Sequence, residues 1–404
     1  MHKLYQVTEL LDWDSFRMTI AYNSIIDTVT RPEEELLLYC ARTDMGSDTA
    51  ERMQCLCRGQ IDWNYLIGAA SAHGVKPLLC SALINSCPEA VPNHILGQLQ
   101  RYLQANSLKN LFLTRELIRL LGALEKIGIT AIPWKGPVLA ATAYGNVALR
   151  QFGDLDILVR EQDAIRAKDM FLSSGYHLQY QGSAENLVAF HNLRQVVELV
   201  RDDGRVVVEL QWAITSQTFY FPFDPASLWE QVETVSLNGT PVCNLSPEDL
   251  LIVLCVHGAK HHWANLRWIC DIAELLRAYS KRIDWARVMN RARALGGARM
   301  LALGLHLAHD LVGAEMPMDV LQHIQGEPKL AFLAAEVRAR LFSGGWLMAV
   351  DRPNFYVQLR ERPQDRMRCR LYLAYLMLAP SAQAWTRWLL HSMHLGRHFL
   401  HRAI

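Results

Sequence analysis

Three features are scarce in this sequence of 404 residues: an excess of one charge, long apolar runs and cysteines at metal-binding spacing. Lys and Arg number 41 and Asp and Glu number 40, so the net charge of +1 creates no overall field that favours nucleic acid. The longest apolar run, residues 250–256, is too short to span a membrane and is better explained as a buried helix. With 51% hydrophobic and 20% charged residues, the composition predicts a soluble globular chain of two or three domains.

The nine cysteines are scattered, and Cys55 and Cys57 form only a C-x-C pair. No two C-x-x-C units occur at zinc-binding spacing, which argues against a structural zinc site. The first residues, MHKLYQVTELLDWDSF, are too acidic and too interrupted for a secretory leader. An odd number of cysteines without such a leader is typical of reduced thiols, so we expect a cytoplasmic protein.

Positive charge gathers near the end of the sequence. Five arginines between residues 360 and 370 face only Glu361 and Asp365, and the last twenty residues contain no acid. The arginines of both stretches are Arg360, Arg362, Arg366, Arg368, Arg370, Arg387, Arg397 and Arg402. Such a run is most often the solvated face of terminal helices, and the alternative is a contact with a polyanionic partner.

Apolar spacing and turn signals divide the chain into an N-terminal helical region (1–107), a mixed α/β core (108–245) and a C-terminal helical region (246–404). Residues 107–128 carry leucines at helical spacing. An alternating run, the turn 202–204 and a second run predict a β-hairpin over 195–212. Further helices are expected from an N-cap at Ser246 and over 267–280, 285–313, 329–342 and 364–402. The expected fold class is therefore α/β (α+β), with a small mixed sheet between helical regions.

We expect the site of chemistry in residues 129–159, which read ITAIPWKGPVLAATAYGNVALRQFGDLDILV. This stretch predicts a strand, a tight turn at Lys135-Gly136, a short helix, a loop and a second strand. Asp154 and Asp156 lie two apart in that second strand, so both carboxylates project from one face. Two neighbouring carboxylates repel each other unless they share a cation, and such pairs often bind Mg²⁺, although most D-x-D pairs in strands merely face water.

Three neighbours strengthen this interpretation. Gly136, followed by Pro137 at a helix start, lets a phosphate approach the backbone, and Lys135 adds charge; the alternative is a plain strand-to-helix turn. Arg150 is placed either to hold a triphosphate or to pair with an aspartate. Glu209 lies among valines, where a carboxylate needs a partner such as a shared metal ion, unless it faces solvent on an edge strand.

This arrangement resembles the nucleotidyltransferase superfamily related to DNA polymerase β. Within it the sequence is most similar to the bacterial family labelled uncharacterised nucleotidyltransferase, over about residues 62–271. The positions that carry the resemblance are Lys135, Gly136, Leu139, Tyr144, Arg150 and Gly153-Asp154-Leu155-Asp156-Ile157-Leu158-Val159. One departure is Gln211, where the family strand often has His, which puts the substrate or the activity in question.

The resemblance implies that Asp154 and Asp156, helped by Glu209, hold two Mg²⁺ ions. It also implies that an NTP such as ATP is held by Lys135, Gly136, Pro137, Arg150 and Gly153. A nucleoside monophosphate would then pass to a hydroxyl of an acceptor, and pyrophosphate would leave. The acceptor is open: a small molecule, a peptide or protein, or an RNA end.

Residues 257–271 contain a second polar group. His257 and His261 share a helix face, followed closely by the rest of a candidate substrate pocket: Trp263, Arg267 and Asp271. Packing between sheet and helices explains these residues equally well.

Two other functions stay open for the whole protein. One is a catalytically degenerate member that binds a nucleotide or a partner, and the other is a toxin-like nucleotidyltransferase that modifies tRNA.

Overall fold

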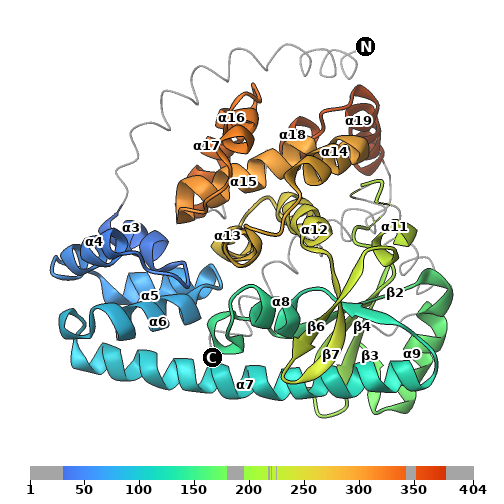
Figure 1. Ribbon diagram of the computed structural model, residues 1–404, viewed down its shortest axis with the longest axis horizontal. Helices are drawn as coiled ribbons and strands as arrows, with labels where there is room; N and C mark the ends of the chain where they lie inside the picture. The colour runs from blue at the N-terminus through green and yellow to red at the C-terminus, as the bar shows by residue number, and fades with distance from the viewer. Residues whose placement is uncertain are drawn as a thin grey trace.

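The computed structural model describes residues 31–179, 195–216, 219, 221–223, 225–342 and 352–378. A small sheet lies between the long helix α7 (Asn93–Lys126) and a group of C-terminal helices, with the N-terminal helices beside them (Figure 1). The expected α/β (α+β) class, a small mixed sheet flanked by helices, is confirmed. None of the helices in these residues is long and apolar enough to cross a membrane.

Five strands form the main sheet, in the order β1-β2-β5-β4-β3. Their bounds are β1 Ala131–Pro133, β2 Asp154–Val159, β3 Tyr176–Leu178, β4 Val196–Arg201 and β5 Val207–Gln211. Strands β2 and β5 are parallel, and the other neighbouring pairs are antiparallel. The sheet is therefore mixed, and the predicted hairpin is β4 with β5.

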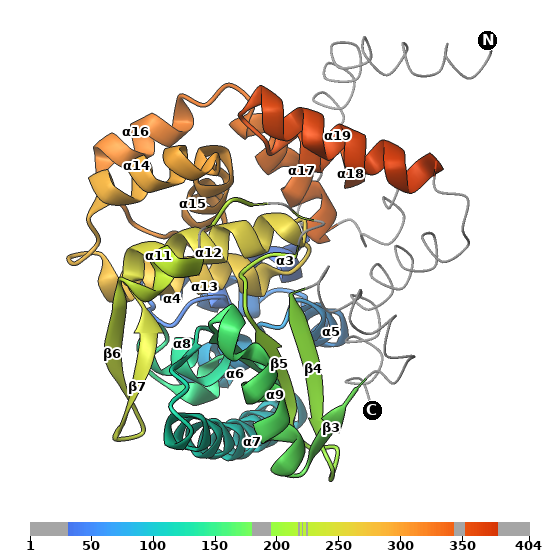
Figure 2. The same cartoon turned by 90° about the vertical axis from the view of Figure 1, so that its right-hand side faces the viewer.

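A second, two-stranded sheet was not predicted. Strands β6 (Val232–Leu237) and β7 (Thr240–Leu245) are antiparallel, and they stand at the edge of the molecule opposite β3 and β4 (Figure 2). Asn238 and Gly239 join them with φ angles of 50° and 82°. Two left-handed residues in a two-residue loop give the turn that matches strand twist, so the Asn-Gly pair was the signal available in the sequence.

The alternation of side chains in β2 separates two hydrophobic cores. Leu155, Ile157 and Val159 point to a core shared with α7 and with α9 (Ala164–Ser173). Leu158 belongs instead to the core of the helical regions. Because successive strand residues point to opposite faces, Asp154 and Asp156 lie on the face that looks toward the C-terminal helices.

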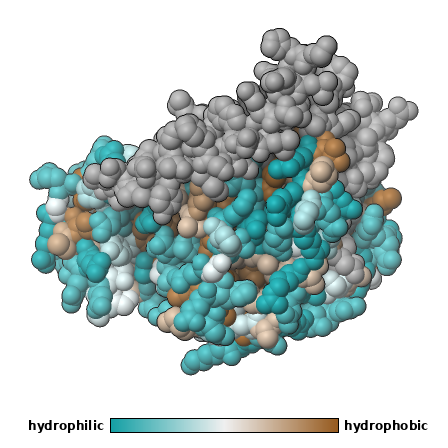
Figure 3. All heavy atoms as spheres, turned by 90° about the horizontal axis from the view of Figure 1, so that it is seen from above, coloured by the Kyte–Doolittle hydropathy of each residue, from teal (hydrophilic) through white to brown (hydrophobic). Residues whose placement is uncertain are grey.

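The remaining helices surround this arrangement. Before α7 come α3 Pro32–Cys40, α4 Ser47–Cys57, α5 Trp63–Ala72 and α6 Lys76–Ser86, and α8 Gly136–Thr142 follows β1. After the main sheet come α11 Pro225–Trp229, α12 Pro247–Lys260, α13 Leu266–Tyr279, α14 Trp285–Leu295, α15 Ala298–Val312, α16 Met318–Gln325, α17 Leu330–Phe342, α18 Arg352–Gln358 and α19 Pro363–Leu378. Seen from above, the coloured surface is mainly hydrophilic, with hydrophobic residues scattered over it (Figure 3).

Some expected boundaries were wrong. The helix expected over 107–128 is the second half of α7, which passes residue 107 without a break. The division of the chain into regions at 107/108 stays a prediction. The helix expected over 285–313 is two helices, because Gly296 adopts a left-handed φ of 71° and ends α14. Of the helices expected over 364–402, the described part of the chain contains α19. The Ser246 cap is present: its side chain accepts a hydrogen bond from the Asp249 backbone N–H.

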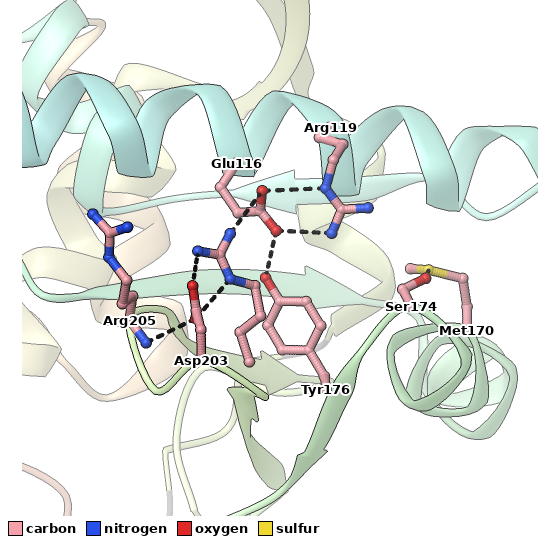
Figure 4. Close-up of polar contacts among 8 residues, drawn as sticks. Glu116, Arg119, Met170, Ser174, Tyr176, Asp203 and Arg205 are labelled. Carbon is pink, nitrogen blue, oxygen red and sulfur yellow. Dashed lines mark hydrogen bonds and ion pairs between the residues drawn. The ribbon is translucent and has the colours of Figure 1, made fainter.

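One polar cluster fastens the sheet to α7 (Figure 4). The buried Glu116 carboxylate on α7 accepts a hydrogen bond of 2.7 Å from the hydroxyl of Tyr176 on β3. It also pairs with Arg119 at 2.7 Å and with Arg201 on β4 at 3.3 Å, and Arg201 in turn pairs with Asp203 in the hairpin turn. These contacts hold the β3 edge of the sheet against α7.

Candidate active site

The sheet brings the three predicted acids together. Asp154 and Asp156 share one face of β2, and the parallel register places Asp156 directly beside Glu209 on β5. Asp156 is buried, with 4% of its surface exposed, and Asp154 and Glu209 are half-buried. Parallel pairing across β2 and β5 thus creates a triad from residues far apart in the sequence.

A fourth carboxylate, missed in the sequence analysis, extends this row. Glu198 on β4 is the antiparallel partner of Glu209, and it is half-buried. Directly opposed strand residues project from the same face. The alternation of the first hairpin strand was the signal that would have found it, because Glu198 and Glu209 occupy equivalent positions around the turn.

The side chains of Lys135 and Gln211 contact the acids directly. The Lys135 Nζ lies 2.8 Å from Asp156 Oδ1 and 4.3 Å from the centre of the Trp134 ring, and 12% of the Lys135 side chain is exposed. The buried Gln211 amide donates from Nε2 to Asp156 Oδ1 at 3.1 Å and to Glu209 Oε2 at 3.0 Å. Gln211, which replaces the family histidine, therefore bridges two of the three acids.

Burial and mutual repulsion raise the pKa values of these acids. Burial, with the charges of Asp156 and Asp154 added, raises the pKa of Glu209 to about 8. Burial also raises the pKa of Asp156, and the charge of Asp154 adds to this while Lys135 opposes it. Raised pKa values of this kind show that the charged forms of these carboxyl groups are poorly solvated and lie close to one another.

The donor set suits a hard divalent cation. Within the residues that the structure describes, no group of three or more His, Cys, Asp and Glu side chains is arranged to hold a metal ion. Mg²⁺ does not need such a cage, because it usually binds through one or two carboxylates, substrate phosphates and water. The carboxylate oxygens of Asp154 and Asp156, with Glu209 beside them, are therefore donors that fit Mg²⁺.

The turn from β1 into α8 lies against the start of β2. Lys135 is the N-cap residue of α8, and Gly136 adopts a left-handed φ of 58°. A Cβ atom at Gly136 would lie 3.4 Å from the Asp154 carbonyl oxygen. Gly136 and Pro137 are buried, and Gly153 directly precedes β2. Glycine is favoured here because the backbone is left-handed at its closest approach to the acids.

Arg150 forms the structural pair that the sequence left as one of two options. Its Nε and Nη2 donate to the two carboxylate oxygens of Asp271 on α13, at 2.7 and 2.9 Å. The Tyr144 hydroxyl donates to the same carboxylate at 2.7 Å. Arg150 and Asp271 are 5% and 1% exposed, and the charge of Arg150 helps to lower the pKa of Asp156 against the effect of burial.

The predicted substrate-pocket residues divide into two groups. The His257 ring packs edge-on to Trp134 at 5.8 Å and lies 4.6 Å from His261, which stacks on Trp268 at 5.0 Å. Burial first, and then the charge of Lys135, lowers the pKa of His257, so this ring is neutral where it packs on Trp134. Neither Trp134 nor Trp268 was singled out in the sequence.

Trp263 and Arg267 make contacts of other kinds. Trp263 is fully buried in the helical core, so close to Gly258 that a Cβ atom there would lie 2.3 Å from its ring. Arg267 donates from Nη1 to the Gln151 carbonyl oxygen at 3.1 Å, and its backbone N–H donates to the His73 carbonyl oxygen at 3.2 Å. Trp263 thus serves packing, and Arg267 joins the loop before β2 to α13.

Comparisons with known proteins show the family of this chain. A model of the uncharacterised nucleotidyltransferase family matches residues 59–313, which include every candidate site residue. No curated protein matches the sequence. The fold is similar to the antibiotic-resistance factor ANT(2'')-Ia at 15% identity and a TM-score of 0.32, over 48% of this chain and 96% of that one. A nucleotidyltransferase-like antigen from Paracoccidioides brasiliensis has the same identity and TM-score, over 53% and 96%. The family match spans more than half of the sequence. The chain therefore belongs to the uncharacterised nucleotidyltransferase family and is a transferase.

Proposed function

We propose that this protein transfers the nucleoside monophosphate of an NTP to a hydroxyl group of an acceptor, in a Mg²⁺-dependent reaction that releases pyrophosphate. The observation that carries the proposal is the placement of Asp154, Asp156 and Glu209 on one sheet face, beside the Lys135-Gly136 turn. Membership of the family supports transfer of a nucleotidyl group. We assign the roles in this transfer to the residues described above.

The acids form the metal side of the site. Asp154 and Asp156 would hold two Mg²⁺ ions, with Glu209 as a further ligand. When bound, Mg²⁺ neutralises phosphate charge and activates the attacking hydroxyl. Gln211 keeps the carboxylates of Asp156 and Glu209 turned toward each other through its two hydrogen bonds.

The turn forms the nucleotide side. Lys135, Gly136, Pro137 and Gly153 would hold the phosphates, because they lie against the start of β2. Arg150 would act from its buried pair with Asp271, supplying positive charge behind Asp156. His257, whose pKa is lowered by burial, and His261 pack against each other near Trp134, and they would line the pocket for the nucleotide or the acceptor.

RNA is one candidate acceptor among several, and the described arginines near the C-terminus give it little support. Arg360 is buried over the Phe219 ring. Arg362 donates to the carbonyl oxygens of Arg293 and Ala294 at the end of α14, and Arg366 donates to those of Arg360 and Glu361. Three of the five arginines thus serve the fold. Arg387, Arg397 and Arg402 lie outside the described residues.

The first test measures the thermal stability of the protein with each of the four NTPs, with and without Mg²⁺. We expect Mg²⁺-dependent stabilisation by at least one NTP, of about 2.7 kcal/mol at 100 times its dissociation constant. The double variant Asp154→Ala/Asp156→Ala should lose this response. Asp169→Ala, a change at an exposed surface carboxylate, should keep it.

The products then separate transferase from kinase. A nucleotidyltransferase releases pyrophosphate and adds a nucleoside monophosphate to the acceptor, whereas a kinase releases the nucleoside diphosphate. Stabilisation without Mg²⁺ that survives in the double variant would point to a degenerate, nucleotide-binding member. No response to any NTP would count against nucleotide transfer and favour a protein that binds a partner.

A further inference from the structure

We infer that Lys135 is a mobile counter-ion, which neutralises Asp156 in the empty site and transfers to the phosphates when nucleotide and metal bind. Metal and nucleotide would then each strengthen the binding of the other. This inference rests on the proposed function and adds to it a way of keeping the site closed to metal until nucleotide is present.

Lys135 and Asp156 form a short ion pair that is largely buried. Lys135 Nζ lies 2.8 Å from Asp156 Oδ1, with 12% and 4% of the two side chains exposed. The pair sits on the sheet face that also carries Asp154, Glu209 and Glu198. An ammonium in so poorly solvated a position is stabilised mainly by the carboxylates that it faces.

Lys135 and a metal ion would compete for the carboxylate of Asp156. Asp156 Oδ1 already accepts from Lys135 and from Gln211. A divalent cation on the same carboxylate would lie within a few ångströms of the ammonium, where two positive charges screened by little water repel strongly. A metal ion alone must therefore displace Lys135 or bind against its charge, and it should bind weakly.

The ammonium of Lys135 could move from Asp156 to the phosphates of a bound nucleotide. Lys135 is the N-cap residue of α8, it ends in a compact ammonium on a flexible stem, and its charge already lies over the face of the Trp134 ring at 4.3 Å. A triphosphate at this turn offers new negative charge, and lysine is a common phosphate ligand. The nucleotide would thus release Asp156 to the metal, and by thermodynamic linkage the metal would favour the nucleotide equally.

The test measures Mn²⁺ binding to the metal-free protein by electron paramagnetic resonance, without nucleotide. It also measures binding of an analogue of the NTP that stabilises the protein most, with a methylene group between the α- and β-phosphates. Lys135→Met removes the charge, and Lys135→Gln removes it while keeping a hydrogen-bond donor for Asp156. Lys168→Met, a change in a surface ion pair, is the control. Circular dichroism checks that each variant is folded.

We expect both Lys135 variants to bind Mn²⁺ alone about tenfold more tightly than the wild type, and to bind the analogue with Mn²⁺ about tenfold more weakly. The two effects have opposite signs, which general damage to the site would not produce. The glutamine variant carries the test if the methionine variant is unfolded.

Unchanged or weaker Mn²⁺ binding in a folded Lys135 variant would overturn the inference, because Lys135 would not compete with metal. Tighter Mn²⁺ binding with unchanged analogue binding would also overturn it, because Lys135 would not pass to the phosphates. If the wild-type protein binds no analogue with or without Mn²⁺, the proposed function itself fails, which is a different result from either of these.

Discussion

The buried carboxylate of Asp271 accepts hydrogen bonds from two side chains. Arg150 contacts both of its oxygens and Tyr144 contacts one, although these residues lie 121 and 127 positions away in the sequence. A buried charge that keeps its partners is tolerated, whereas one that loses them is costly. This contact links the loop before β2 to α13, so it helps to set the position of Asp154 and Asp156.

Arg150→Met should therefore destabilise the protein strongly. It leaves Asp271 charged, buried and without its main partner, and we expect a loss of about 3–5 kcal/mol in the free energy of unfolding. Arg338→Met, which breaks an exposed ion pair with Asp310, should cost about 1 kcal/mol or less. Urea denaturation of both variants measures the difference. Equal costs would mean that the Arg150–Asp271 pair contributes no more than a surface pair.

The position of helix α12 depends on two glycines, Gly258 and Gly304, that pack against the indole ring of Trp263. A Cβ atom at Gly258 would lie within 2.5 Å of three carbon atoms of the Trp263 ring, and one at Gly304 on α15 would lie 3.0 Å from the same ring. The close packing of α12 on α15 thus depends on two residues without side chains. Since His257 is adjacent to Gly258, this packing also sets the position of the histidine beside Trp134.

Gly258→Ala should consequently destabilise the protein, although alanine favours helices. The added methyl group forces the Trp263 ring or the helix to move, which costs about 1–3 kcal/mol in the free energy of unfolding. Gly68→Ala, inside α5 with nothing within 4 Å of the added Cβ, is the matched control. It should stabilise the protein by about 0.5–1 kcal/mol. Thermal or urea unfolding reports both signs, and a stabilised Gly258 variant would contradict the packing described here.

At the scale of the whole molecule, the N-terminal helices dock on the C-terminal ones through polar contacts. The fully buried Glu274 on α13 accepts hydrogen bonds from the backbone N–H and the hydroxyl of Thr43. His73, in the turn between α5 and α6, packs edge-on to Phe342 at the end of α17, with ring centres 6.0 Å apart. Helices from both ends of the described chain thus contact each other directly.

This docking should weaken in acid. Burial lowers the pKa of His73 to about 4, from 6.5, so the folded protein resists protonation that the unfolded chain accepts. The unfolded chain binds more protons between these values, and stability is therefore lost as the pH falls from about 6.5 to 4. The loss should be on the order of 2 kcal/mol. His73→Gln should lose less over this range when unfolding is followed at several pH values, and an identical pH dependence would exclude His73 as the cause.

The sequence by itself determined features that depend on near neighbours. The two-residue period of β2 places Asp154 and Asp156 on one face, Ser246 caps α12, and the turn 202–204 joins β4 to β5. Each follows from the conformational preferences of a few adjacent residues, which a linear pattern contains. The same local signal at Asn238-Gly239 would have found the β6–β7 hairpin.

Only the tertiary structure decided which of these elements meet. The parallel register of β2 and β5 places Glu209 beside Asp156, and the fold brings Lys135 onto Asp156 and Arg150 onto Asp271. It also buries Trp263 completely in the helical core. The physical reason is that a side chain's long-range partner depends on the packing of whole elements and the register of distant strands, neither of which its local sequence contains.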